Sequence, residues 1–265
     1  MDRATPRKPY PSDLTDDQWE VLAIFLPPAK RGGRPREVDL REVVNAILYQ
    51  NRSGCQWDML PHDLLPKSTV YDYFAAWRDD GTWQRLLDAL RGVVRECHAP
   101  EKDATPSAGS IDSQSVKSAG SGGPVGCDGG KKVKGRKRTI AVDTLGLLLA
   151  VVVTPASMQD RDGAKQVLLA AKGRFPRLRV VWADGGYAGK LIGWVRLACG
   201  WLLTTILKAV GQKGFVVLPR RWVVERTFGW FMKYRRLVRD YETEPEMAET
   251  MIRAAMVHRM LRRLC

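Results

Sequence analysis

Cysteine and histidine are scarce in this sequence, and the few present are scattered. A zinc finger needs closely spaced Cys or Cys/His pairs, and none of the cysteines forms such a pair, so this class is excluded. An odd number of unpaired cysteines is typical of reduced thiols, and we therefore expect a cytoplasmic protein. The residues are Cys55, Cys97, Cys127, Cys199 and Cys265, with His62, His98 and His258.

Long apolar runs are also missing. The longest run, residues 145–153, is interrupted by Gly146 and is far shorter than the ~18 residues of a membrane span. We therefore expect no membrane contact. Residues 1–9 are polar and charged, which does not fit a signal peptide. Gly130-Lys131 is followed by lysine instead of Ser or Thr, which excludes a phosphate-binding P-loop.

Positive charge, in contrast, is abundant. Formal net charge is +14, from 43 Lys and Arg against 29 Asp and Glu. A basic surface can simply keep a protein soluble, but here the cations cluster, which favours a nucleic-acid partner. The first cluster follows a glycine-rich stretch and is expected to form a mobile basic loop: Lys131, Lys132, Lys134, Arg136, Lys137 and Arg138. The second includes Arg220, Arg221, Arg226, Lys233, Arg235, Arg236 and Arg239.

Apolar periodicity predicts an all-helical domain over residues 1–98. Its helices are expected after Thr15 and before Pro27, and over 39–51, 70–78 and 82–97, with Ser68-Thr69 capping the third. Helices joined by short connections are typical of a helix-turn-helix, although helical clusters without a DNA role share the pattern. Residues 99–108, rich in Pro and Ala, are predicted to be a linker.

Residues 109–265 predict an α/β domain. We expect strands over 110–116, 138–143, 147–154, 178–184, 201–207 and 215–218, and helices over 160–172, 190–199, 221–236 and 245–264.

Three carboxylates occupy informative places in this domain. Asp112 lies inside a predicted strand, where Asp is disfavoured. Asp184 ends the apolar run 180–183, just before a Gly-Gly pair. Glu225 lies on a predicted helix, four residues after Arg221 and about three turns before Arg236, so all three would share one face.

Each carboxylate also has a purely structural explanation. Asp112 could end its strand or lie on its wet face, Asp184 could serve a turn, and Glu225 could form a solvated pair with Arg221. If they converge, two of them about 4 Å apart repel by about 4 kcal/mol at an effective dielectric constant of about 20. Divalent cations would remove that repulsion, and hard oxygen ligands suit Mg²⁺ or Mn²⁺. Two such ions can stabilise both the attacking and the leaving oxygen at phosphorus.

Other acidic residues have local explanations. Asp143 lies in the predicted hairpin turn Asp143-Thr144-Leu145-Gly146, where Asp is common. Asp160 and Asp162 are expected to cap a helix.

The chain resembles the IS5-type insertion-sequence transposases, which carry a DDE catalytic triad. Leu14 to Trp19, Gly32 to Pro35 and Leu48 to Trp57 resemble the N-terminal domain of that family. Its three catalytic motifs resemble Ile111-Asp112-Ser113-Gln114-Ser115, Ala183-Asp184-Gly185-Gly186-Tyr187 and Arg221-Trp222-Val223-Val224-Glu225-Arg226-Thr227.

The resemblance implies an RNase H-like mixed sheet flanked by helices, preceded by the helix-turn-helix-like domain. It implies a transposase that binds terminal inverted repeats and cuts and joins DNA with two Mg²⁺ ions, for which Mn²⁺ can substitute. Asp112, Asp184 and Glu225 would be the catalytic metal ligands. The partners would be double-stranded DNA and a second copy of the chain, as a homodimer or higher oligomer on DNA associated with the nucleoid.

The chain departs from the family pattern after the glutamate motif. Related transposases often carry Tyr-x2-Arg-x3-Glu-x6-Lys, whereas here Leu218 replaces Tyr and position 232 is Met. Lys233 or Arg236 would then supply the cation at the transposon end. Arg221, Arg226 and the six cations of residues 131–138 are expected to bind phosphates. A same-fold nuclease and a catalytically inactive or regulatory DNA-binding protein remain as alternatives.

Overall fold

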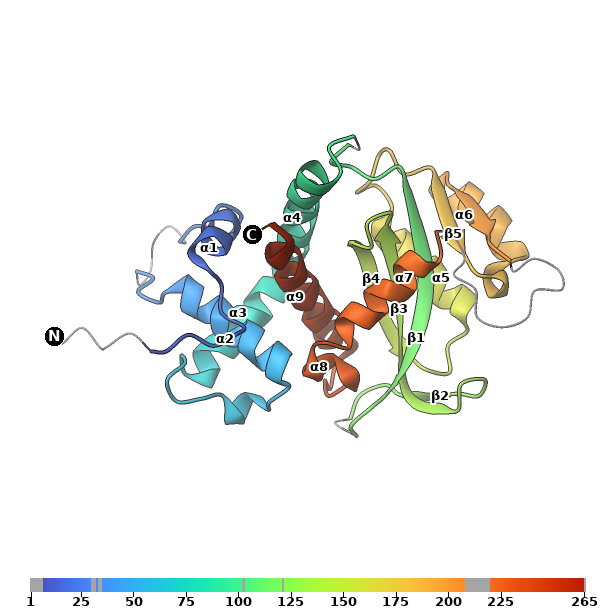
Figure 1. The fold of residues 1–265 in the computed structure, drawn as a ribbon. Coiled ribbons are helices and arrows are strands. Elements are labelled where there is room, and N and C mark those ends of the chain that lie inside the picture. The colour runs from blue at the N-terminus through green and yellow to red at the C-terminus, as the bar shows by residue number, and fades with distance from the viewer. Residues whose placement is uncertain are drawn as a thin grey trace.

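The computed structural model describes residues 7–29, 32, 35–101, 103–120, 122–207 and 220–264. Figure 1 shows a group of N-terminal helices beside a mixed sheet, with α4 and α9 between them. The predicted strand at 215–218 lies outside the described residues. None of the helices in the described part of the chain is both long and apolar enough to span a membrane.

The N-terminal helices form where capping residues and apolar periodicity predict them. They are α1 (Asp16–Ala23), α2 (Leu40–Ser53), the short 3₁₀ helix η1 (Trp57–Met59), α3 (Lys67–Asp79) and α4 (Thr82–His98). Thr15 and Gln18 form a capping box on α1, and Gly54 ends α2 with a left-handed φ of 76°. The predicted cap of the third helix is wrong, because α3 begins earlier, after Pro66. Asp80 and Gly81 alone join α3 to α4.

Within the residues that the structure describes, the sheet has six strands of mixed direction. They are β1 (Ala108–Lys117), β2 (Gly126–Asp128), β3 (Val133–Asp143), β4 (Leu148–Pro155), β5 (Val180–Ala183) and β6 (Leu202–Thr205). β3 pairs antiparallel with β1, β4 and the short β2, whereas β1, β5 and β6 run parallel. This is the mixed sheet flanked by helices that the sequence predicts.

Helices cover both faces of the sheet, because its strands alternate between two apolar sets. On one face, Ile111 of β1 and Ala141 of β3 pack with α5 (Asp160–Ala171) and α6 (Lys190–Cys199). On the other, the β3 side chains Ile140 and Val142 pack with α7 (Trp222–Phe231) and α9 (Pro245–Leu264). Another short 3₁₀ helix, η2 (Gly185–Tyr187), follows β5, and α8 (Arg235–Val238) follows α7.

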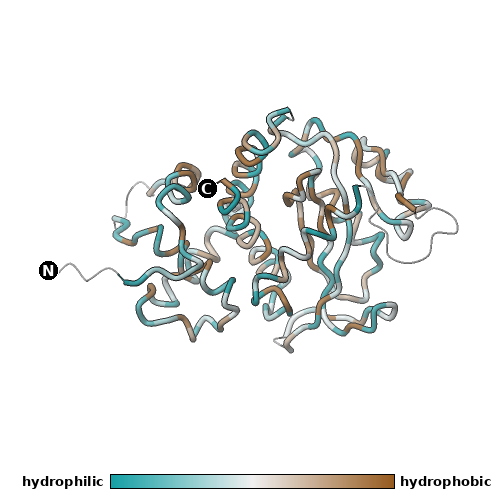
Figure 2. The backbone as a smooth tube through the Cα atoms, in the orientation of Figure 1, coloured by the Kyte–Doolittle hydropathy of each residue, from teal (hydrophilic) through white to brown (hydrophobic). Residues whose placement is uncertain are grey.

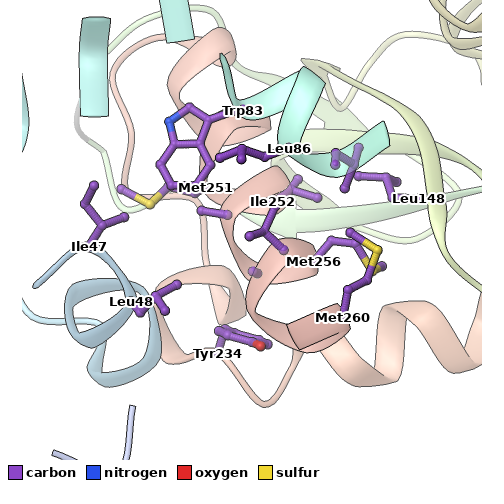
Figure 3. Close-up of a cluster of buried hydrophobic side chains, with 14 of the residues drawn as sticks. Ile47, Leu48, Trp83, Leu86, Leu148, Tyr234, Met251, Ile252, Met256 and Met260 are labelled. Atoms are coloured by element: carbon purple, nitrogen blue, oxygen red, sulfur yellow. The ribbon is translucent and has the colours of Figure 1, made fainter. Parts of the chain in front are cut away.

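The core continues from the sheet into the N-terminal helices. Met251, Ile252, Met256 and Met260 of α9 are fully buried, and Figure 3 shows them between side chains of α2, α4 and β4. Figure 2 shows hydrophobic positions where α9 meets the sheet and hydrophilic ones around β2. The division into domains at residues 99–108 stays a prediction, but the apolar cluster crosses it.

Two predicted elements differ from the structure. The expected basic loop is wrong beyond residue 132, because residues 133–138 form the start of β3. The expected helix over 221–236 is broken, because Tyr234 leaves the helical conformation with φ −102° and ψ 109°. Its ring is buried against His258 of α9, with centroids 5.8 Å apart. Tyr234 lies in the sequence between α7 and α8, and the helix is interrupted there so that the aromatic ring is buried against α9.

Candidate active site

Strand register places Asp112 beside Asp184. Ser110 of β1 lies opposite Trp182 of the parallel strand β5. Continuing that register by two residues sets Asp112 level with Asp184, at the carboxyl end of the β5 strand. Such strand ends are where open α/β sheets bind ligands. Asp112 shares its sheet face with its cross-strand partner Ile140, so its side chain faces α7.

Asp112 is half-buried, and its Oδ1 accepts the Ser113 backbone N–H at 2.8 Å. Burial raises the pKa of the Asp112 carboxyl to about 6, and the negative charge of Asp184 raises it further, against the opposing effects of the Ser113 N–H, Arg221 and Lys131. Removing a carboxylate from water next to another anion disfavours its charged form. Holding the Asp112 carboxylate ionised next to Asp184 therefore costs free energy, and a bound cation would remove that cost.

Asp184 caps the N-terminus of η2 and is more exposed than Asp112. Its Oδ1 accepts the Gly186 N–H at 2.8 Å, which fixes the carboxylate at the turn. Its side chain is 37% exposed, so its second oxygen can be reached from solvent.

Arg221 links Asp184 to Glu225. Its Nη2 lies 3.9 Å from Asp184 Oδ2 and 3.4 Å from Glu225 Oε1. Glu225 lies in the first turn of α7, and its side chain is 47% exposed. The three predicted carboxylates thus border one region, with a guanidinium between two of them.

These carboxylates do not form a closed metal cage. Within the residues that the structure describes, no three His, Cys, Asp or Glu side chains gather closely enough to hold a metal ion. The donor set nevertheless suits a hard divalent cation, because every donor is a carboxylate oxygen. The Arg221 guanidinium supplies the positive charge between Asp184 and Glu225. To bind a metal ion together with the aspartates, the exposed Glu225 side chain would have to turn away from Arg221 and toward them.

Four of the predicted phosphate-binding residues are exposed. Lys131, Lys132, Lys134 and Lys233 reach solvent, and Lys131 Nζ donates to the Ser113 carbonyl at 3.3 Å, one residue from Asp112. Arg226 is half-buried, with its guanidinium carbon 4.3 Å from the Trp222 ring centroid.

The other predicted phosphate contacts are wrong for this structure, because the side chains are buried and already paired. Arg136 lies 3.3 Å from Asp240 and also donates to the carbonyl of Glu242. Arg138 donates to the Leu237 carbonyl at 2.6 Å, and burial lowers its pKa to about 10.

The same holds for two further cations. Lys137 pairs with Asp160 at 2.7 Å, and Arg236 pairs with Glu242 at 2.6 Å. Because α7 ends at Phe231, Arg236 also lies outside the helix that carries Glu225, which overturns the predicted shared face.

Two other aspartates of this domain, Asp143 and Asp160, have structural partners. Asp143 is fully buried in its hairpin turn, as expected, and pairs with Arg95 at 2.7 Å. Neither Asp160 nor Asp162 caps α5, because Gln159 holds the cap position. The Asp160 carboxylate instead accepts the Ser113 hydroxyl and pairs with Lys137. These two aspartates therefore do not compete for the role of metal ligands.

Tyr187 is a neighbour of the site to which the sequence assigned no role. Its ring is buried in η2, and burial, followed by the charge of Asp112, raises the pKa of its phenol. The Tyr187 phenol is therefore uncharged and lies close to Asp112. Its place three residues after Asp184 is the sequence signal that could have identified it.

Two family models match the chain. The model described as "Transposase DDE domain" matches residues 103–260, and the model described as "Putative transposase of IS4/5 family" matches residues 14–87. The chain belongs to the DDE transposases of insertion sequences. Members of this family depend on divalent metal ions.

One relative is the uncharacterized protein y4sN of Sinorhizobium fredii (strain NBRC 101917 / NGR234). It is 32% identical over 77 residues, which cover 29% of this chain and 62% of that protein. The match thus spans less than two thirds of the relative's length.

Proposed function

We propose that this DDE transposase binds the terminal inverted repeats of its element and cuts and joins DNA strands by divalent-metal-dependent phosphoryl transfer. The observation that carries the proposal is the register that sets Asp112 beside Asp184, with Arg221 lying between Asp184 and Glu225 of α7. Membership in the family supports the same chemistry.

Asp112, Asp184 and Glu225 are the residues that would hold two Mg²⁺ ions, or Mn²⁺ in their place. When bound, such ions stabilise the attacking and leaving oxygens of an in-line displacement at phosphorus. Asp112 contributes a carboxylate that is mostly ionised above its pKa of about 6, and Gly186 orients that of Asp184. Glu225 is exposed enough to turn toward them.

The cations near the carboxylates would bind the DNA backbone. Arg221 can move from its carboxylate partners to a phosphate, because an Arg guanidinium matches phosphate geometry equally well. Lys131 is exposed beside β1, where it donates to the Ser113 carbonyl, and Lys233 is exposed just after the far end of α7. Their contacts would make affinity strongly dependent on salt.

The N-terminal helices would recognise the inverted repeat. The short connection between α3 and α4 contains Gly81, as the turn of a helix-turn-helix often contains glycine, and Tyr71 of α3 is 40% exposed. Joining two DNA ends calls for two protein copies, so we propose a homodimer or higher oligomer on DNA. Such a protein would act in the cytoplasm, at the nucleoid.

Cleavage and strand transfer of a labelled duplex from the element's own end, in Mg²⁺ or Mn²⁺, test the proposal. Asp184→Ala should abolish both reactions while DNA binding persists. Asp162→Ala, an exposed aspartate on α5, is the matched control and should retain both.

Cutting without joining by the wild type would indicate a nuclease of the same fold. Binding without cutting on authentic ends, in both metals, would indicate an inactive or regulatory DNA-binding protein.

A further inference from the structure

Three arginines surround one indole ring where α7 meets α9. The guanidinium carbons of Arg226, Arg259 and Arg263 lie 4.8, 4.8 and 6.0 Å from the centroid of the Trp230 ring. We call these three residues the arginine cluster. Arg259 and Arg263 are four residues apart on α9, so they share a face of the helix.

The arginine cluster has no acidic partner among the described residues. No salt bridge in that part of the chain includes any of the three, although Arg226 donates to the Leu145 carbonyl at 2.9 Å. Buried nitrogens of all three, namely Nε of Arg226, Nε of Arg259 and Nη1 of Arg263, lack a hydrogen-bond acceptor there. The nearby buried aspartate, Asp143, is paired with Arg95.

Crowding of like charges is unfavourable without an anion. Burial and then the positive charges of Arg263 and Arg259 lower the pKa of Arg226, and burial and Arg259 lower that of Arg263, while the negative charge of Asp143 opposes both shifts. Stacking on Trp230 attracts each cation but neutralises none. The arrangement therefore favours an anionic ligand with several oxygens.

The arginine cluster lies between the carboxylates and the N-terminal helices. Glu225 and Arg226 are consecutive on α7, so their side chains point about 100° apart, Glu225 toward Arg221 and Arg226 toward Trp230. At the end of α9, Arg262 donates to the Pro11 carbonyl, and Figure 1 shows that end beside α1.

We propose that the arginine cluster binds backbone phosphates of duplex DNA that crosses α7 from the carboxylates toward the N-terminal helices. A helix is ~10–12 Å wide and DNA rises ~3.4 Å per base pair, so the contacted phosphates lie about three base pairs from the one at the carboxylates. This inference rests on the proposed function, because it assumes that DNA reaches Glu225.

The salt dependence of DNA affinity reports how many phosphates the protein contacts, and it can be measured without metal ions and therefore without DNA cleavage. Fluorescence anisotropy would follow binding of a labelled generic duplex over a KCl series in EDTA. Each lost phosphate contact lowers the slope of log K against log [salt] by about 0.9. The Arg226→Gln/Arg259→Gln/Arg263→Gln variant should lose about 2 to 3 from the magnitude of the slope.

A matched control removes equal charge on the side of the sheet away from α7. Lys172, Arg179 and Arg196 are exposed near α5, β5 and α6, and their triple Gln variant should keep the wild-type slope. Thermal unfolding checks that the variants fold. If the cluster variant does not fold, Arg263→Gln alone should lower the slope by about 1.

Equal slopes for cluster and control variants would overturn the inference. Absence of any DNA binding by the wild type would overturn both this inference and the proposed function. A selective loss of slope, together with authentic ends that are bound but never cut, would retain the phosphate site and overturn only the proposed catalysis.

Discussion

Asp112→Asn should stabilise the metal-free protein at pH 8, although it should abolish catalysis. The folded structure raises the pKa of Asp112 from 3.8 to about 6, chiefly by burial. At about 1.4 kcal/mol for each tenfold change in proton affinity, the charged carboxylate destabilises the fold by up to about 3 kcal/mol. Asparagine keeps the shape and the oxygen that accepts the Ser113 N–H, but it carries no charge.

The effect should depend on pH in a defined direction. Because the pKa of Asp112 is higher in the folded protein than in the unfolded chain, the folded state binds the proton more tightly. The penalty is therefore full above about pH 7, declines as the pH falls through 6, and disappears below about 3.8. The stability advantage of Asp112→Asn should follow the same course.

Asp143→Asn provides a matched control with the opposite sign. Asp143 is equally an aspartate facing the protein interior, but it pairs with the buried Arg95 at 2.7 Å and accepts the Leu145 and Leu147 N–H groups. Neutralising it leaves Arg95 buried without a counter-charge, which should cost about 3–5 kcal/mol.

Urea unfolding followed by tryptophan fluorescence, in EDTA at pH 8 and pH 5, would measure both variants. Addition of Mg²⁺ should then stabilise the wild type more than Asp112→Asn, since a ligand that binds only the folded state raises its stability. A lower stability of Asp112→Asn than wild type at pH 8 in EDTA, or a gain that does not change with pH, would refute the reasoning.

Three further substitutions test other parts of the structure. Glu225→Gln should slow cleavage by about a thousandfold or more, because it weakens stabilisation worth several kcal/mol, whereas duplex binding by anisotropy should be unchanged; equal losses of both would contradict a catalytic role. Arg136→Met should reduce the free energy of unfolding in urea by about 3–5 kcal/mol, because Asp240 would remain buried and unpaired; a neutral effect would show that this pair is dispensable. Met251→Ala should cost about 2–5 kcal/mol and shift one cooperative transition seen by all probes, because its cavity lies in the shared core. Two separate transitions would contradict a core that crosses residues 99–108.

Local patterns were sufficient for most elements but not for their ends. The apolar positions of α9 recur at helical spacing, and the predicted and observed helices both begin at Pro245. The break after Phe231 could not be predicted, because it depends on Tyr234 packing against His258 of a later helix. Sequence periodicity carries no information about such a long-range partner.

The candidate site was predictable in its residues and less so in its geometry. Asp112 and Asp184 were recognisable as polar residues in or after buried strands, but their adjacency depends on the pairing of β1 with β5. That pairing joins residues far apart in the chain. The position of Arg221 between Asp184 and Glu225 is also tertiary, since the sequence predicted only its pairing with Glu225.

The basic clusters show why charge must be considered together with strand alternation. Arg136 and Arg138 are spaced by two, and the same alternation continues into Ile140 and Val142, which face α9. With a period of two residues, the sequence predicts that both arginines lie on the same face of the sheet as Ile140 and Val142, the face covered by α7 and α9. Most of their acceptors lie about a hundred residues later, in the segment from Leu237 to Thr243, so only the tertiary structure shows that these buried cations donate to backbone carbonyls. Net charge therefore overstates the surface available to DNA. The arginine cluster on Trp230 becomes the more informative basic feature, because one buried nitrogen of each arginine lacks an acceptor and none of the three has an acidic partner among the described residues.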